Sequence, residues 1–161
     1  MFTGSTQMAL DGKGRLAIPA RLRERLAAQC GGHLGGHLVV TADPTSGCLL
    51  LYPYPEWEKV AARLNALPSL DPIAKELKRL VIGSAEEVEP DGAGRILIPP
   101  MLRRFAKLDK SVALVGQGEK FEIWDDATWQ GLFEQAAQFP QQLAVAARDG
   151  TLSEGLKGFS L

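Results

Sequence analysis

The chain lacks three features that would place it in common functional classes: long apolar runs, a set of cysteines, and an excess of charge of one sign. No apolar stretch approaches the roughly 20 residues that a membrane-spanning helix needs, so we expect no membrane role. Residues 1–5 have neither the basic start nor the apolar segment of a secretory signal. Cys30 and Cys48 are the only cysteines, too few for a disulfide framework, and they predict a protein of the reducing cytoplasm.

Motifs for catalysis and metal binding are also missing. The sequence has no Ser/His/Asp set and no Walker-type phosphate loop, and its Gly-x-Gly elements lack the third glycine of a dinucleotide site. Cys30, His33, His37 and Cys48 include a His-x-x-x-His spacing that zinc sites use. Both histidines, however, belong to a duplicated glycine-rich tetrad, and neither cysteine has a Cys-x-x-Cys partner. We therefore predict no enzyme activity, no metal and no cofactor.

The chain does contain a repeat, with an offset of 80 residues. Residues 11–19 read DGKGRLAIP, and residues 91–99 read DGAGRILIP. Further on, LLLYPYPEW at 49–57 is matched by FEIWDDATW at 121–129, and apolar residues follow both final tryptophans at helical spacing. One fold unit is therefore written twice, and each copy is expected to end in a helix whose apolar stripe faces a core.

The first copy is longer than the second between its arginine and its tryptophan. The offset falls from 80 residues at the arginines to 72 at the tryptophans, so the first copy has eight extra residues. The duplicated tetrad GGHLGGHL at residues 31–38 accounts for part of this excess. We expect this segment to be a loop, because the entropy of closing a loop rises only slowly with its length.

Positive charge is concentrated at the two motifs. Residues 11–25 carry five cationic and two acidic side chains, and residues 91–110 carry the same numbers, in a chain whose net charge is −1. The rest of the chain is therefore acidic. This distribution favours local binding of a polyanion over non-specific coating of nucleic acid, which the pI of about 6.1 also disfavours.

Local patterns predict an α+β architecture of short strands and helices. The expected strands are residues 8–10, 15–18, 38–41, 49–52, 87–89, 95–98, 112–115 and 121–124. The expected helices, besides those after the tryptophans, are residues 20–29, 73–82, 100–106 and 140–148. The predicted organisation is a first repeat (1–66), a linker with a connecting helix (67–82), a second repeat (83–139) and a helical tail (140–161).

The repeated loop has the chemistry of an anion-binding site. Gly14 carries no Cβ, so the backbone beside Lys13 can approach another surface closely. Arg15 stands where the loop becomes a strand, and its fork of donors suits phosphate oxygens or the O6 and N7 acceptors of guanine. Asp11 is placed to pair with Arg15 and hold its rotamer. The second copy offers the equivalent set of Gly94, Arg95 and Asp91.

A purely structural interpretation of the loop stays open, since Asp-Gly is by itself a strong signal for a hairpin turn. A turn needs no basic helix after it, whereas both copies are followed by arginines. Lys13 is replaced by Ala93 in the second copy, so the first loop should bind anions more strongly.

The chain resembles, from end to end, the MraZ family of bacterial transcriptional regulators in the AbrB-like swapped-hairpin superfamily. The resemblance is carried by the two Asp-x-x-x-Arg motifs and by the opening Met-Phe-x-Gly. It is also carried by the strings LLLYPYPEWE, LVGQGEKFEIWDDATW and LSEGLKGFSL. It implies two tandem swapped-hairpin β-rich units that form a pseudo-dimer within one chain, with flanking helices. The GGHLGGHL insertion departs from the usual length of the family but touches neither motif.

The resemblance further implies a function in transcription. Family members are usually repressors of the promoter of the division and cell-wall gene cluster, and they bind guanine-rich direct repeats in double-stranded DNA as rings of several subunits. Such a protein would work in the cytoplasm at the nucleoid. The residues carried over as DNA contacts are Lys13, Gly14, Arg15, Gly94 and Arg95, with Asp11 and Asp91 positioning the loops. Candidate phosphate contacts are Arg21, Arg23, Arg103 and Arg104.

Three further points have alternatives. The basic loops could instead bind an acidic protein partner or support assembly, in which case DNA affinity would be indifferent to sequence. The tryptophans Trp57, Trp124 and Trp129 are expected to pack in the core rather than stack on bases. Leu132 and Phe133 fit either the interior or a subunit interface.

Overall fold

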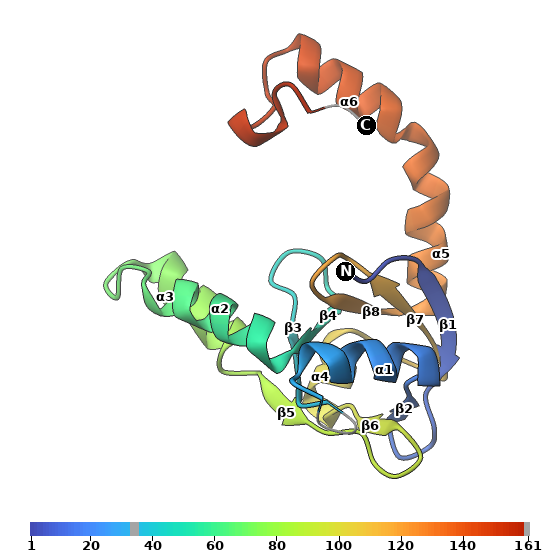
Figure 1. The fold of residues 1–161 in the computed structure, drawn as a ribbon. Coiled ribbons are helices and arrows are strands. Elements are labelled where there is room, and N and C mark those ends of the chain that lie inside the picture. The colour runs from blue at the N-terminus through green and yellow to red at the C-terminus, as the bar shows by residue number, and fades with distance from the viewer. Residues whose placement is uncertain (33–35, 160–161) are drawn as a thin grey trace. The chain divides into compact units, whose positions relative to one another are not determined.

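The computed structural model describes residues 1–32 and 36–159. The chain divides into two compact units, Met1–Ala127 and Thr128–Leu161 (Figure 1). Both Asp-x-x-x-Arg motifs lie in the first unit. His33, one of the candidate zinc ligands, lies outside the described residues.

The first unit is built on a six-stranded antiparallel sheet with the order β1-β7-β8-β4-β3-β5. A separate antiparallel pair joins β2 to β6. The strands in chain order are β1 (Ser5–Ala9), β2 (Arg15–Ala17), β3 (Leu38–Ala42), β4 (Leu49–Pro53), β5 (Glu86–Val88), β6 (Arg95–Leu97), β7 (Ser111–Gly116) and β8 (Phe121–Asp125).

The strands of the two repeats are exchanged. β1 of the first repeat pairs with β7 of the second, and β5 of the second pairs with β3 of the first. In the small sheet, Leu16 of β2 lies opposite Ile96 of β6. Each repeat thus contributes an edge strand that pairs with a strand of the other repeat in one shared sheet, which confirms the predicted α+β class with tandem swapped-hairpin units.

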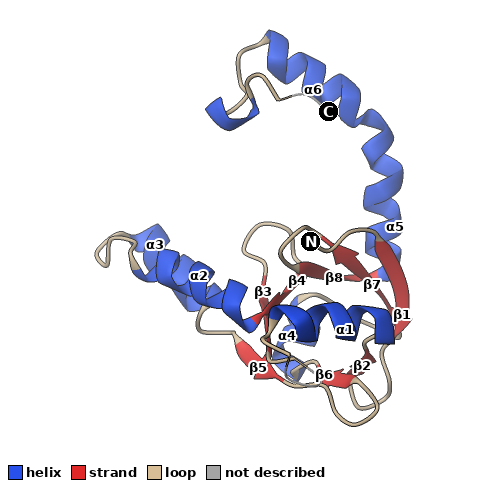
Figure 2. Ribbon diagram, viewed as in Figure 1, coloured by secondary structure: helices blue, strands red, loops and turns tan. Residues whose placement is uncertain are grey.

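The described residues contain six α-helices (Figure 2). They are α1 (Ala20–Gln29), α2 (Tyr54–Asn65), α3 (Pro72–Val81), α4 (Pro100–Phe105), α5 (Asp126–Gln135) and α6 (Phe139–Arg148), with 3-10 turns at Ala136–Gln138 and Glu154–Leu156. Pro19 and Pro99 precede α1 and α4 with φ of −56° at both, so the ring of each proline ends the strand and starts the helix at the same place in each repeat. No helix among the described residues is long and apolar enough to cross a membrane.

The core of the first unit is shared by both repeats. All five residues of β3 and of β4 are buried, and Leu16, Ile18, Ile96 and Ile98 are at most 3% exposed. Trp57 and Trp124 are 9% and 7% exposed, which confirms their predicted place in the core. The motif strands are therefore anchored by apolar side chains that both copies contribute.

The prediction that the helix of the second copy turns an apolar stripe to a core is wrong. In α5, Leu132 and Phe133 are 40% and 67% exposed, and Trp129 is half-buried with its ring 6.1 Å from that of Phe133. The matching helix α2 contacts β4 and α3, whereas the chain after α5 continues into α6. The same spacing therefore leads to different environments, because the following segment differs between the copies.

Several predicted boundaries are corrected by one to three residues. β1 begins at Ser5 rather than at residue 8, because its polar start pairs with β7. β2 and β6 end one residue earlier than predicted. Ile18 and Ile98 still donate their backbone N–H groups to Gly94 and Gly14 in the register of the pair, but the N–H groups of these glycines donate to Asp91 and Asp11 within their own loops. α3 begins at Pro72, where the Asp71 side chain accepts a hydrogen bond from the Ala74 N–H at 2.9 Å.

Lys107, just after α4, has φ of +52° and is the one described non-glycine residue with positive φ. This conformation costs an L-residue about 1–2 kcal/mol, and glycine avoids the cost but loses about 0.5–1 kcal/mol in chain entropy. We expect Lys107→Gly to raise the free energy of unfolding by about 0.5–1 kcal/mol. Urea unfolding monitored by tryptophan fluorescence would measure it, and a decrease in stability would contradict the assigned conformation.

Candidate nucleic-acid interface

Loop 1, residues 11–15, is closed by the carboxylate of Asp11. Its Oδ1 accepts hydrogen bonds from the backbone N–H groups of Lys13 and Arg15, both at 2.9 Å, and its Oδ2 accepts from Arg15 Nε at 2.7 Å. The Gly14 N–H donates to the Asp11 carbonyl at 2.9 Å. One carboxylate therefore fixes both the turn and the base of the arginine side chain.

Loop 2, residues 91–95, repeats this geometry. Asp91 Oδ1 accepts from the backbone N–H groups of Ala93 and Arg95 at 2.9 Å, and Oδ2 accepts from Arg95 Nε at 2.9 Å. The side chain of Arg95 is 37% exposed and that of Arg15 is 29% exposed. In both loops the ion pair occupies Nε, so the outer part of the guanidinium stays available to a ligand; among the described residues, neither arginine makes any further side-chain hydrogen bond.

The geometry that the two loops share depends on glycine at the fourth position of each loop. Gly14 and Gly94 have φ of +81° and +76°, which side-chain-bearing residues rarely adopt. A Cβ built on Gly14 would overlap the guanidinium of Arg103, and one built on Gly94 would overlap that of Arg23. Each loop is thus covered by an arginine from the helix of the other repeat.

Arg23 and Arg103 are structural as well as charged. In each, Nε is buried and has no hydrogen-bond partner among the described residues. Ile18 donates to the Gly94 carbonyl and Ile98 to the Gly14 carbonyl, both at 2.9 Å, so the backbone links the repeats at the same place. The sequence predicts basic helices after the loops, but no local pattern in it predicts that each helix reaches the opposite loop.

The two loops differ in charge. Lys13 is exposed on loop 1, whereas loop 2 has Ala93 at that position. Arg21 on α1 and Arg104 on α4 are also exposed, and the structure places them on the helices that follow the loops. Loop 1 therefore presents two cations and loop 2 presents one.

The hydrogen bond from the Arg15 N–H is the main cause that lowers the pKa of the Asp11 carboxyl, and the Arg95 N–H does the same to Asp91. Because the pKa is lower in the folded than in the unfolded state, the ionised carboxylates stabilise the folded loops at pH values above the ordinary aspartate pKa, near 3.9. This stabilisation is lost as the pH falls through the lower pKa of the folded state. We expect both loops to keep their structure at pH 5. Carboxyl ¹³C chemical shifts of Asp11 and Asp91, followed during acid titration, would test this, and midpoints at or above the ordinary aspartate pKa would contradict it.

The described residues of the candidate zinc set make other contacts. His37 Nε2 lies 2.7 Å from Glu87 Oε2, and its ring stacks on that of Tyr54 with centroids 4.4 Å apart. Cys30 Sγ donates to the carbonyl of His37 rather than facing its ring. The Cys48 thiol, whose pKa is raised by burial, belongs to a separate buried cluster.

That buried cluster comprises Asp43, Cys48 and Glu122, whose ligand-type atoms lie within 4.8 Å of one another. Asp43 accepts hydrogen bonds from the N–H and hydroxyl of Thr45, and Glu122 accepts one from Trp124 Nε1 at 2.8 Å. Asp43 and Cys48 lie five residues apart in sequence, but Glu122 comes from the second repeat, so the spacing of residues does not predict the cluster. These hydrogen bonds give the carboxylates a structural role at the ends of β3, β4 and β8.

The interleaved strands and the paired basic loops define a swapped-hairpin protein in which two copies of one unit are fused. The family model described as "MraZ protein, putative antitoxin-like" matches residues 1–80 and again residues 81–150. The chain belongs to the MraZ family.

Full-length relatives agree with this assignment. The chain is 52% identical to the transcriptional regulator MraZ of Nitrosomonas europaea and 53% identical to that of Nitrosospira multiformis. It is 47% identical to that of Halorhodospira halophila. Each comparison covers 161 residues and all of both chains. The names of these relatives describe a regulator, a role that is not enzymatic.

Proposed function

We propose that the protein is a sequence-specific DNA-binding regulator of transcription that presents loops 1 and 2 to double-stranded DNA. The observation that carries the proposal is the matched presentation of Arg15 and Arg95. In each, one aspartate fixes the Nε end through an ion pair of 2.7 or 2.9 Å, and the arginine makes no further side-chain hydrogen bond among the described residues. A fork held in this way suits bidentate contact with the O6 and N7 atoms of guanine.

The other site residues have supporting roles. Lys13 adds a phosphate or base contact to loop 1, and Gly14 and Gly94 let the backbone approach the DNA. Asp11 and Asp91 position the arginines. The exposed Arg21 and Arg104, and the half-buried Arg23 and Arg103, supply charge against the phosphate backbone.

The energy of one loop explains why several subunits would act together. A good bidentate base contact contributes about 1–3 kcal/mol of discrimination, too little for a regulator on its own. We propose that subunits assemble in a ring and bind successive guanine-rich direct repeats. Once one subunit is bound, its neighbours meet the adjacent repeats at a high effective concentration, so the contacts of several subunits together give tight binding. We assign the promoter of the division and cell-wall gene cluster as the target, and binding of the protein there would repress transcription of the cluster. The protein would act in the cytoplasm, at the nucleoid.

We also propose that the organisation in sequence serves this task, with a first repeat at 1–66, a linker and connecting helix at 67–82, a second repeat at 83–139 and a helical tail at 140–161. Because β1 and β5 each pair with a strand of the other repeat in one shared sheet, the two loops belong to one folding unit. A rigid relation between the loops follows, which is what recognition of a fixed DNA geometry requires.

The test is a fluorescence-anisotropy titration of the protein against DNA from upstream of its own gene and against a scrambled duplex. The salt concentration should be about 150 mM, where long-range attraction is screened. We expect a clear preference for the promoter DNA, and native mass spectrometry should show an oligomer. Equal weak binding to both duplexes would reject the proposal and favour an acidic protein as the partner of the loops.

A further inference from the structure

Each loop borders a groove that it shares with the helix of the other repeat. Groove 1 lies between loop 1 and α4, has a volume of about 920 Å³, and is lined by the cations Arg103, Arg104, Lys107 and Lys110. Groove 2 lies between loop 2 and α1 and has a volume of about 490 Å³, and Arg23 is the one cation among the described residues that line it. The acidic residues on the walls are Asp11 and Asp109 in groove 1, and Glu24 and Asp91 in groove 2.

The difference between the grooves comes from three substitutions within the repeat. At the offset of 80 residues, Arg104 stands where the first repeat has Glu24. The other two replacements are Lys107 for Ala27 and Lys110 for Cys30. Arg23 and Arg103, which cover the opposite loops, are the same in both. The pseudo-symmetric scaffold is therefore kept, while groove 1 has cations at three positions where the first repeat has none.

These charges are not neutralised within the protein. Asp11 already pairs with Arg15, and among the described residues Arg104, Lys107 and Lys110 form no ion pair. Arg104, Lys107 and Lys110 are all exposed. Lys107 is also the residue held at φ of +52°, a conformation that glycine or asparagine would adopt more easily. A lysine in this place adds charge at the mouth of the groove at a cost to backbone energy.

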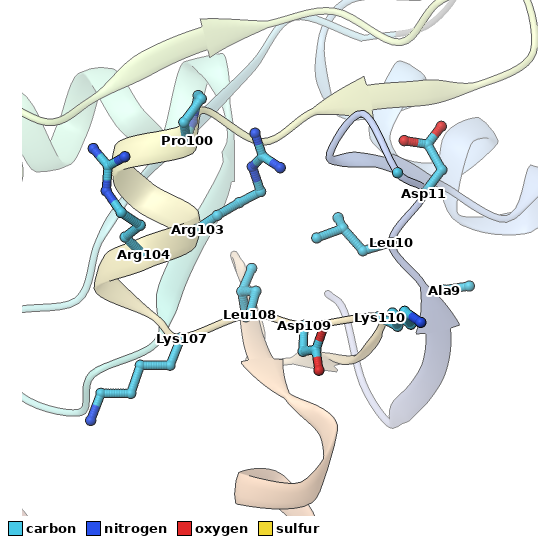
Figure 3. Close-up of a pocket in the computed structure, with 11 residues that line it drawn as sticks. Ala9, Leu10, Asp11, Pro100, Arg103, Arg104, Lys107, Leu108, Asp109 and Lys110 are labelled. Atoms are coloured by element: carbon cyan, nitrogen blue, oxygen red, sulfur yellow. The ribbon is translucent and has the colours of Figure 1, made fainter.

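The cations do not converge on a single point. Figure 3 shows Arg103 extending from α4 toward the loop that carries Asp11, whereas Arg104 and Lys107 point outward from the opposite side of the helix. Lys110 lies near Ala9, beyond Asp109 (Figure 3). A small anion is best bound by donors that meet around it. Cations spread along a wide groove instead match a row of phosphates along a nucleic-acid strand.

We infer that groove 1 binds the phosphodiester backbone of the DNA whose bases loop 1 contacts, and that groove 2 does not. The inference rests on the proposed function and adds to it a direction: DNA bound at loop 1 continues across α4 and the turn after it. Loop 1 and groove 1 then form one continuous surface with residues from both repeats, whereas loop 2 has a weaker role.

The test is a triple variant, Arg104→Gln/Lys107→Asn/Lys110→Gln, in which asparagine suits the positive φ. The control is Lys75→Gln/Lys78→Gln/Arg79→Gln, which removes the same charge from α3. For wild type and both variants, the affinity for promoter and scrambled DNA is measured between about 50 and 200 mM salt, and circular dichroism confirms folding. Each phosphate contact contributes about 0.9 to the slope of log K against log salt.

We expect the triple variant to lose at least about 2 units of slope on both duplexes while keeping its preference for the promoter, and the control to match wild type. Equal slopes in the triple variant and the control would overturn the assignment of groove 1. A wild type without sequence preference would reject the proposed function itself, and the assignment with it.

A second arm separates DNA from a free phosphate ligand. Inorganic pyrophosphate is added to the wild-type complex with DNA, with ionic strength held constant by sodium chloride. We expect no displacement of DNA beyond the effect of ionic strength. Displacement in wild type that the triple variant does not show would overturn the assignment to DNA and identify a site for small phosphates.

Discussion

Arg15→Ala should abolish sequence-specific DNA binding and leave the fold intact. The variant loses a bidentate base contact of about 1–3 kcal/mol, which is roughly a 5- to 150-fold loss in affinity for every subunit engaged. Where several subunits of one ring bind neighbouring repeats, these losses multiply. Anisotropy titration with promoter and scrambled DNA should show that the variant binds both equally weakly.

The fold should survive because loop 1 does not depend on the Arg15 side chain. Asp11 keeps its hydrogen bonds from the backbone N–H groups of residues 13 and 15 when the guanidinium is gone. The side chain of Arg15 is 29% exposed and is not part of the apolar core, so its removal leaves the core packing unchanged. Thermal unfolding should coincide with that of wild type, and a cooperative transition at a much lower temperature would contradict this account.

Two companion variants separate charge from geometry. Arg15→Lys keeps the positive charge but lacks the planar fork, so it should retain non-specific binding and lose the preference for the promoter. Arg95→Ala removes the equivalent residue of loop 2. This loop has Ala93 in place of Lys13 and borders groove 2, where Arg23 is the one cation among the described lining residues. Its effect should be smaller than that of Arg15→Ala, and an equal or larger effect would mean that both loops contact DNA alike.

The parts of the fold that the sequence predicts well are those that local interactions decide. α1 spans residues 20–29 as predicted, because Pro19 fixes its start and its leucines recur at helical spacing. The strands β3, β4, β7 and β8 are also found within about one residue of their predicted bounds, since branched residues fill them. The duplicated loop could be recognised because aspartate, glycine and arginine recur in register.

The parts that the sequence does not predict depend on distant contacts. The strand character of Ser5 and Thr6 comes from pairing with β7, more than 100 residues away in the chain. The placement of Arg103 over Gly14 follows from the exchange of elements between repeats and has no local signal. Groove 1 was missed for the same reason, because Lys107 and Lys110 become neighbours of loop 1 only in the folded unit.

The exchange of strands also leads to the largest expected effect on stability, which is that of Ile96→Ala. Ile96 lies opposite Leu16 in the β2–β6 pair, and both side chains are completely buried. Truncation of a buried isoleucine removes apolar contacts and leaves a cavity, at a cost of about 2–5 kcal/mol. This is a large part of the stability of a typical domain, so urea unfolding should show a much lower midpoint.

Leu97→Ala is the matched control, since Leu97 is the next residue in β6 and is 51% exposed. Its cost should stay within about 0.5 kcal/mol. The comparison tests more than burial, because Ile96 belongs to the second repeat but packs against the strand that follows loop 1. If the repeats fold as one unit, Ile96→Ala should weaken DNA binding through Arg15 in proportion to the unfolded fraction. Two separate unfolding transitions, with Arg15-dependent binding preserved, would show instead that each repeat is stable alone.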